Sequence, residues 1–477
     1  MIKEKKHVLF IQTDQWSGSY FGFAGHPSVM TPTIDQLARD GIVFDRCYST
    51  CPVCIPARRS LMTGTSPRTH GDRLYQDRLP MPEMPTLAEA FKRGGYQTVA
   101  VGKLHVYPQR NRIGFDEVIL QEEGRYEFGV VDDYQIWLGE QGYVGQEFAH
   151  GMGNNTYLAR PWPLPEYTHP TAWTTREMVR QIKRRDPCRP FFFYISYQFP
   201  HPPLVPPADY LAMYGADSVI PPVEGDWEDD SLVIRYMTEN SHIYSAREIQ
   251  LARRAYFAQC TYIDHQIRLL IGTLREQGLL HNTLIVFTSD HGDMLFDHHI
   301  VGKRCFYEAS ANIPLIFSGK PVEEKRGMVD GRLACLEDVM PTLLEFCGLP
   351  KPETVEGFSL FGDETRHCLF GEISEGVKAT RMILDERYKL IYYPFGNKKQ
   401  LFDIKKDRQE LHDLAGQEKY RVVSERLEEE LIRELYGEDR RWVVDGKLVG
   451  EACPEYAPSQ DYGFSNQRGL HWPPPEK

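Results

Sequence analysis

The chain has 477 residues, of which 41% are hydrophobic and 26% are charged, and this is the composition of a folded globular protein. Its 55 basic and 67 acidic residues give a formal net charge of -12, which argues against nucleic acid as a partner. No apolar run reaches the roughly 20 residues of a membrane span, and the N-terminus lacks the apolar segment of a secretory signal. We therefore expect a cytoplasmic protein with no membrane partner.

Short apolar runs alternate with amphipathic helical runs along the first three quarters of the chain. Several of the apolar runs end in polar residues, as strands of an open α/β sheet do where they reach a ligand site. The alternation predicts an α/β fold with a large, mostly parallel sheet sandwiched by helices. The expected strands are 8–11, 42–44, 97–101, 191–196, 284–287 and 313–317, and the expected helices are 33–39, 86–92 and 246–277.

The pattern changes after residue 365. Short alternating strands, followed by one amphipathic run, predict a smaller C-terminal antiparallel sheet with a closing helix. The expected strands are 368–372, 381–384, 388–393 and 400–403, and the expected helix is 420–435. We assign 1–365 to a catalytic domain, 366–440 to this small sheet and 441–477 to an extended tail.

Three segments carry no motif that identifies a ligand. Residues 122–186 are rich in Gly, Pro and aromatic residues, and we expect them to form long loops over one face of the sheet. We expect substrate selection to depend on these loops, on residues 204–245 and on the tail.

The run 54–64 (CIPARRSLMTG) places Cys54 immediately before a predicted helix. Pro56 suits the first helical position and Gly64 suits the exit. A helix start favours an anionic group, and Arg58 can reach back to add positive charge. Two other interpretations are a Cys-x-x-Cys zinc or redox pair with Cys51, and a buried structural cysteine. No second Cys-x-x-Cys accompanies the first.

This run resembles the signature of the sulfatase family, Cys-x-Pro-(Ser or Ala)-Arg followed by an apolar residue, Thr and Gly. The resemblance implies the fold of the alkaline phosphatase superfamily. It also implies that a maturation enzyme oxidises Cys54 to formylglycine, whose hydrated aldehyde attacks sulfur. Residues 94–105 resemble the second sulfatase signature, which ends in Gly-Lys-x-His.

Asp14 and Asp290 each follow a predicted strand, and two carboxylates brought to one point form a site for a hard cation. Each aspartate by itself is more typical of a cap or a turn. The resemblance implies that Asp14, Gln15, Asp290 and His291 bind one divalent metal ion. Many sulfatases have Asp at the position of Gln15 and Asn or His at the position of His291. We expect calcium, and the imidazole leaves manganese and zinc open.

The resemblance also implies roles for five cationic or imidazole side chains, of which Lys103 and His105 by themselves would be read as a solvated lysine beside a surface histidine. Lys103, Lys303 and Arg58 would offset negative charge on the sulfuryl oxygens. His201, with Lys303, would protonate the leaving oxygen, and His105 would take a proton when sulfate is released. We expect residues 297–299 (DHH) to be supporting or structural.

The predicted reaction is hydrolysis of a small sulfate ester, such as a sulfated sugar or an aryl sulfate, to an alcohol and inorganic sulfate. The main alternative is a phosphonate monoester or phosphodiester hydrolase of the same superfamily. Those enzymes lack the Lys-x-His pair that Lys103 and His105 form here. A non-catalytic binding protein would not need so many filled polar positions, and a two-zinc phosphatase would have Ser or Thr at position 54. The oligomeric state stays open.

Overall fold

The computed structural model describes residues 6–124, 130–227, 231–239 and 241–457. Within these residues the central sheet has eight strands in the order β10-β2-β9-β7-β1-β6-β4-β5. Only β9 runs antiparallel to its neighbours in this sheet, so the predicted mostly parallel sheet is confirmed. The strands are β1 (His7–Asp14), β2 (Gly41–Phe44), β4 (Gln97–Gly102), β5 (Glu117–Leu120), β6 (Phe191–Pro200), β7 (Thr283–Ser289), β9 (Leu315–Ser318) and β10 (Met328–Asp330).

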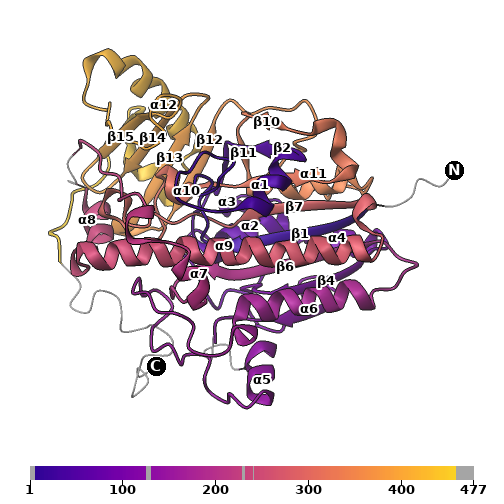
Figure 1. Cartoon of the computed structure of the whole chain (residues 1–477). Helices are drawn as coiled ribbons and strands as arrows, with labels where there is room; N and C mark the ends of the chain where they lie inside the picture. The colour runs from indigo at the N-terminus through magenta and orange to yellow at the C-terminus, as the bar shows by residue number, and fades with distance from the viewer. Residues whose placement is uncertain (1–5, 125–129, 228–230, 240, 458–477) are drawn as a thin grey trace.

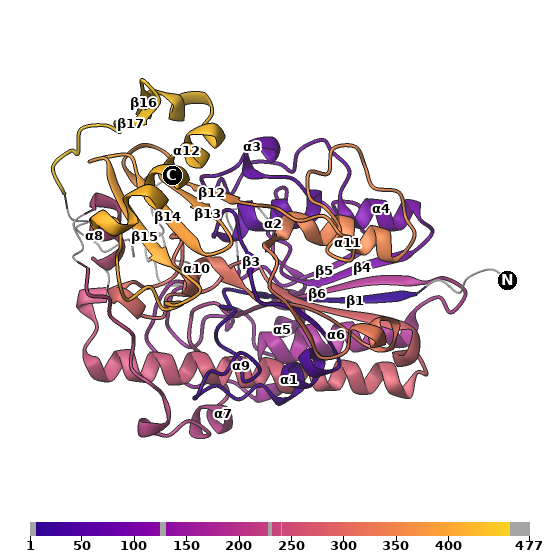
Figure 2. The ribbon, with the colours of Figure 1, turned by 90° about the horizontal axis from the view of Figure 1, so that it is seen from above.

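Helices cover both faces of this sheet, as Figures 1 and 2 show. Successive side chains of a strand point to opposite faces, and both faces of β1 are buried. Leu9 and Ile11 pack in one apolar core, whereas Val8 and Phe10 pack in the other. The first core includes α1 (Pro32–Arg39), α6 (Pro170–Arg184) and α9 (Ala246–Glu276), and the second includes α2 (Cys54–Thr63), α4 (Leu87–Arg93) and α11 (Val339–Phe346).

The expectation of loops throughout 122–186 is wrong for two described parts of that segment. It contains α5 (Asp133–Glu140) and the 15-residue α6, which starts at Pro170 behind the capping side chain of His169. The buried face of α6 includes three threonines among its apolar residues, so the hydrophobic periodicity is weak in the sequence. The rest of the described part of the segment is mainly loop, and residues 125–129 lie outside the described residues.

Two local expectations also need correction. Helix α2 begins at Cys54 itself, so Pro56 is not at its first position, although Gly64 ends the helix with φ 66° as expected. The predicted strand 313–317 is divided at Pro314, which has no N–H to donate to a ladder. Its first part is β8 (Asn312–Ile313), which joins β3 (Cys47–Tyr48) and β11 (Ala334–Cys335) in a separate small sheet.

The C-terminal part contains the predicted antiparallel sheet, with strands β12 (Leu369–Ile373), β13 (Thr380–Leu384), β14 (Tyr388–Tyr393) and β15 (Lys398–Asp403). Helix α12 (Arg421–Glu434) packs on one face. The other face joins the main body, where the fully buried Lys389 lies 2.7 Å from Glu308 and 2.8 Å from Glu410. The first described part of the predicted extended tail is a hairpin, β16 (Val443–Val444) and β17 (Lys447–Leu448), and residues 458–477 lie outside the described residues.

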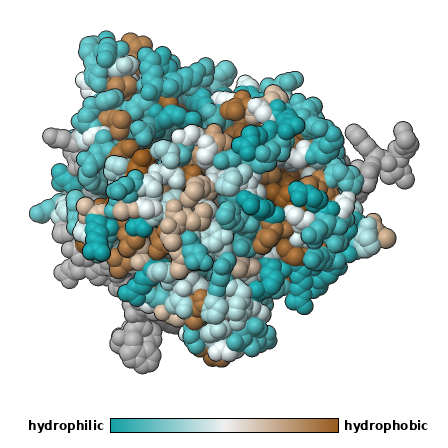
Figure 3. All heavy atoms as spheres, viewed as in Figure 1, coloured by the Kyte–Doolittle hydropathy of each residue, from teal (hydrophilic) through white to brown (hydrophobic). Residues whose placement is uncertain are grey.

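The face shown in Figure 3 is mostly hydrophilic, with scattered apolar patches. In the described ranges, no helix has both the length and the apolar character needed to cross a bilayer. The cytoplasmic location stays a prediction.

Candidate active site

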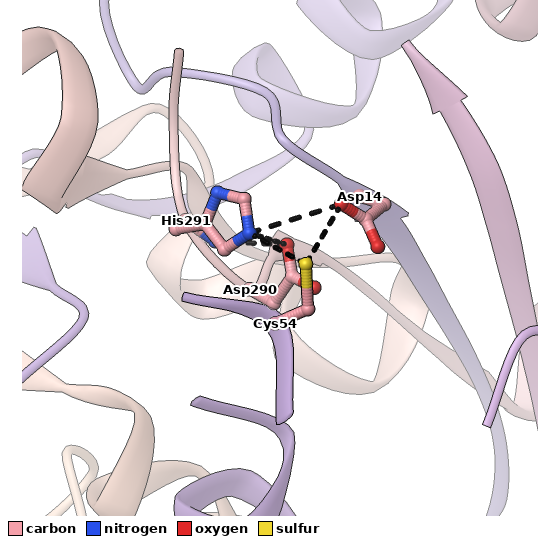
Figure 4. Close-up of side chains that lie close together, drawn as sticks. All are labelled: Asp14, Cys54, Asp290 and His291. Atoms are coloured by element: carbon pink, nitrogen blue, oxygen red, sulfur yellow. Dashed lines mark hydrogen bonds and ion pairs between the residues drawn. The ribbon is translucent and has the colours of Figure 1, made fainter. Parts of the chain in front are cut away.

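Four buried side chains meet at the carboxyl ends of β1 and β7 and at the start of α2 (Figure 4). Asp14 ends β1 and Asp290 follows β7. Because these two strands are parallel neighbours, both residues lie at the same edge of the sheet. The sulfur of Cys54 lies 3.1 Å from Nε2 of His291 and 3.7 Å from Oδ1 of Asp14. None of the four residues is more than 2% exposed. The fold thus brings the predicted nucleophile and three of the four predicted metal ligands together.

Arg58 lies one helical turn beyond Cys54 and joins the two carboxylates. Its Nε is 2.8 Å from Asp290, and one terminal nitrogen is 3.2 Å from Asp14. The other terminal nitrogen donates to the carbonyl of Lys103 and to the hydroxyl of Ser196. Burial alone would lower the pKa of Arg58, but Asp290 and Asp14 raise it overall. The guanidinium is therefore a permanent positive charge in the site.

Lys103 enters the site directly from the end of β4. Gly102 has φ 102°, and a Cβ on it would lie 2.0 Å from the carbonyl oxygen of Ser196, so the turn requires glycine. The Lys103 ammonium is fully buried, lies 2.5 Å from Asp14 and contacts Glu123. Burial would raise the pKa of Asp14, but Lys103 and the other nearby cationic groups hold it well below its usual range.

His105 lies two residues beyond Lys103, with its ring in an edge contact with Tyr75. Its φ is 61°, a left-handed conformation that is strained for a residue with a side chain. The carboxylate of Glu122 accepts hydrogen bonds from the backbone N–H groups of Leu104 and His105, at 2.7 and 2.8 Å. Glu122 therefore holds the backbone that carries His105.

Lys303, His201 and Gln15 form a connected group on the other side of the site. The Lys303 ammonium lies 2.8 Å from Nε2 of His201 and 2.5 Å from the amide oxygen of Gln15. Nδ1 of His201 donates to the carbonyl of Pro202, so Nε2 accepts the hydrogen bond from Lys303. Burial, and then Lys303, lower the pKa of His201 well below its usual range.

Gln15 itself is held in place by two residues that sequence reasoning missed. Its amide nitrogen donates to Asp293 at 2.6 Å and to Tyr157 at 2.8 Å, and its φ is 69°. Asp293 directly follows the recognised 290–292 segment, and this position could have identified it as a site residue. Tyr157 lies in a stretch without a motif. The amide oxygen of Gln15 already accepts from Lys303, and its role as a metal ligand stays a prediction.

Glu122 and Glu123 were missed as well, because they lie far from any signature. Residues 297–299, which we expected to be supporting or structural, make contacts away from the Cys54 cluster. Asp297 pairs with Arg253 at 3.0 Å, and the ring of His298 packs against Trp227. His299 is largely exposed.

The donor set fits a divalent cation. One ligand atom from each of Asp14, Cys54, Asp290 and His291 lies within 4.8 Å of the others. Nδ1 of His291 is 2.9 Å from the carbonyl of Gly292, so Nε2 presents its lone pair toward Cys54 and the carboxylates. Two carboxylates suit calcium, and the imidazole also suits manganese or zinc.

Two protein-family descriptions match this chain. The description "Sulfatase" matches residues 6–349, and "N-sulphoglucosamine sulphohydrolase, C-terminal" matches residues 296–436. An arylsulfatase from Clostridium perfringens is 34% identical over 468 residues, which cover 93% of this chain and 97% of the relative. A choline-sulfatase from Rhizobium meliloti is 28% identical, with 87% of this chain and 83% of the relative covered.

Solved structures show the same fold. The phosphonate monoester hydrolase of Agrobacterium radiobacter superposes with a TM-score of 0.76 at 24% identity, covering 90% of this chain and 95% of that chain. Because the family description spans more than half of the chain and the clostridial relative spans nearly all of it, the resemblance in the sequence is confirmed. The chain belongs to the sulfatase family of sulfuric ester hydrolases, within the alkaline phosphatase superfamily.

Proposed function

We propose that this sulfatase acts on a small sulfate ester, such as a sulfated sugar or an aryl sulfate, with a nucleophile made from Cys54. The observation that carries the proposal is the position of Cys54, whose sulfur lies 3.1 Å from His291 and beside Asp14, within reach of Arg58 and Lys103. Oxidation to formylglycine by a maturation enzyme would supply an oxygen nucleophile that can also release its sulfuryl group afterwards.

Asp14, Asp290 and His291, with Gln15, are the proposed ligands of one divalent cation, calcium by preference. When bound, this ion would lower the pKa of the nucleophile and offset negative charge on sulfuryl oxygens. The Lys103 ammonium is fixed 2.5 Å from Asp14 and is positioned for the same sulfuryl oxygens. Arg58 bridges the two carboxylates and keeps them aligned with the start of α2.

Lys303 and His201 are the proposed source of the proton for the leaving alcohol. Nε2 of His201 accepts from Lys303, so in this arrangement the transferable proton is on the lysine. His201 then orients the ammonium, while the Gln15 amide oxygen holds it from the other side. His105 is the proposed acceptor of the proton that leaves the nucleophile when sulfate is released.

Peptide mass spectrometry tests the nucleophile directly. The tryptic fragment 47–58 from cells able to mature sulfatases should contain an aldehyde at position 54 in place of the thiol. The aldehyde should react with a hydrazide probe, and the same peptide from cells lacking the maturation enzyme should not. An unmodified thiol in fully active enzyme would contradict the proposal.

Hydrolysis of phosphonate monoesters is the second candidate, favoured by the structural likeness to phosphonate monoester hydrolases. Lys103, which is buried against Asp14, forms the Lys-x-His signature together with His105. This signature favours sulfate, because it distinguishes sulfatases from that group. We expect a higher kcat/KM for 4-nitrophenyl sulfate than for an aryl phosphonate monoester. The reverse order would make the second candidate the correct function.

A further inference from the structure

A small cavity lies close to the site, and its wall includes Phe199 and Pro203, which flank His201 in the chain. Glu123 forms part of its wall, and the same carboxylate contacts the Lys103 ammonium. Gln198, near the end of β6, forms another part. Glu123 therefore connects this cavity with the lysine proposed to hold the sulfuryl group, and the cavity is placed to receive part of the leaving alcohol.

Two residues that line this cavity each have a buried side-chain oxygen with no hydrogen-bond partner among the described residues. These oxygens are Oε1 of Gln121 and Oδ1 of Asn154. Gln121 is 3% exposed and Asn154 is 7% exposed, so water does not compensate them freely. The amide nitrogen of Gln121 already donates to Gln198, which fixes the orientation of its oxygen. Because an unpaired buried acceptor is costly, both oxygens favour a donor that the described residues do not provide.

The charge of the wall restricts what this donor can be. Among the described residues, Glu123 and Glu147 are the acidic residues in the wall, and the lining includes no lysine or arginine. Burial, and then Arg160, lower the pKa of His150 to about 4, so this wall residue is neutral at physiological pH. Glu123 is paired with Lys103, so Glu147 is the carboxylate that gives the described wall its negative charge. A wall rich in acceptors that carries this charge disfavours a carboxylate or a second sulfate and favours a hydroxyl or ammonium group.

The size of the cavity limits the group that enters. Its volume is about 30 Å³, which is room for one water-sized group. Apolar faces of aromatic residues complete the wall, and such faces pack against the C–H groups next to a hydroxyl or against a cation. These aromatic residues are Tyr134, Phe148, Trp162 and Phe199.

We propose that this cavity, resting on the proposed sulfate ester hydrolysis, binds one hydrogen-bond donor on the alcohol part of the substrate. The oxygens of Gln121 and Asn154 accept from that donor. The preferred substrate is then a sulfate ester whose alcohol carries a further hydroxyl or ammonium group, such as a sulfated sugar or amino sugar. A plain aryl sulfate lacks this contact.

Steady-state kinetics on the matured enzyme test the proposal, with monosulfates of glucose and of glucosamine as probes and 4-nitrophenyl sulfate as the donor-free reference. The measured quantity is the ratio of kcat/KM for the best sugar sulfate to kcat/KM for the reference. Asn154→Leu and Gln121→Leu should each lower this ratio by about tenfold or more, because each removes an acceptor for a buried donor. Gln36→Leu, on the exposed side of α1, is the matched control and should keep the ratio.

A second variant covers the case in which leucine disturbs the loop. Asn154→Asp keeps the size and an acceptor but adds negative charge, so it should raise kcat/KM for glucosamine sulfate relative to glucose sulfate. In the wild type, faster turnover of the glucosamine ester identifies an ammonium group in the cavity, and faster turnover of the glucose ester identifies a hydroxyl. Both results support the proposal.

Ratios unchanged in both leucine variants would overturn the proposal, as would an unchanged preference in Asn154→Asp. If the enzyme released sulfate from 4-nitrophenyl sulfate but from neither sugar sulfate, the proposed function would stand and the proposed donor-binding cavity would be rejected. No sulfate release from any ester, by enzyme with a confirmed aldehyde at position 54, would contradict both.

Discussion

Nε2 of His291 lies 3.1 Å from the sulfur of Cys54, while Nδ1 of the same ring lies 2.9 Å from the carbonyl of Gly292. The carbonyl fixes which nitrogen carries the proton, and it leaves a lone pair facing residue 54. Burial and Asp14 would raise the pKa of the Cys54 thiol, but nearby positive charges, including Lys303 and Lys103, lower it overall. The position is therefore prepared for a negatively charged group before any modification occurs.

Replacing Cys54 by Ala or Ser should abolish turnover while keeping the fold. Neither side chain can become an aldehyde, so kcat/KM for 4-nitrophenyl sulfate should fall by at least about a thousandfold. Circular dichroism and thermal melting would show that both variants are folded. Full activity in either variant would rule out the mechanism.

Removal of the metal ion should inactivate the enzyme and lower its thermal stability. An ion that binds only the folded state adds about 2.7 kcal/mol when it is present at a hundred times its dissociation constant. Melting curves after chelation, followed by addition of calcium, manganese or zinc, would measure this gain for each ion. Asp290→Asn should weaken binding of the effective ion, and equal melting temperatures with and without ions would argue against the site.

Arg58→Ala should destabilise the folded protein by about 3–5 kcal/mol, because it leaves two buried carboxylates without their shared cation. Arg58→Lys should recover only part of the loss, since a single ammonium cannot donate in the same forked geometry. Urea unfolding would measure both changes, with Arg39→Ala on α1 as the control. A fully stable Arg58→Ala protein would show that the pairing contributes little.

Glu122→Ala should lower kcat by about tenfold or more, because the backbone N–H groups of Leu104 and His105 lose their acceptor. The left-handed turn at His105 would then relax. Glu122→Gln keeps an acceptor oxygen and should restore most of the rate. Equal kcat values in the two variants would show that the carboxylate does not position this turn.

Asp264 provides a test of stability against pH at a distance from the site. Burial raises the pKa of this carboxyl to about 6, although it accepts hydrogen bonds from the backbone N–H groups of Thr33 and Ile34. Since its folded pKa lies above the unfolded value, the folded state binds the extra proton. The stabilisation that comes from this bound proton is fully present at low pH. It is lost as the pH rises from about 4 through about 6.

The variant Asp264→Asn should therefore become more stable relative to the wild type between pH 4 and pH 7, by up to about 3 kcal/mol. Unfolding free energies of both proteins across this range would give the difference. A difference that moves in the opposite direction would mean that the start of α1 stabilises the carboxylate more than burial disfavours it.

The sequence was sufficient to predict the strands whose ends carry the site. Asp14 and Asp290 close buried apolar runs, and parallel strands deliver both ends to one edge of a sheet. Gly102 and Lys103 lie in a recognisable signature. The residues that support them could not be predicted, because Glu122, Glu123 and Tyr157 reach the site only through loops whose path no local pattern specifies.

The helix α6 shows a second reason for failure. Helices are read from the period of apolar residues, but its buried face includes Thr171, Thr174 and Thr175. Burial of Thr175 is compatible with its hydroxyl because that hydroxyl bonds to the carbonyl of Thr171 and to the hydroxyl of Tyr197. Composition alone cannot show that such partners will be present.

Lys389 of the small sheet is buried against Glu308, which follows the loop that carries Lys303. A protein truncated near residue 365 would keep this glutamate in the interior without its counter-ion, and would expose the apolar surface around Phe306 and Tyr307. The two parts of the chain are therefore expected to unfold together in one transition. Loss of about the last quarter of the sequence would disable an active site to which that quarter contributes none of the proposed ligands.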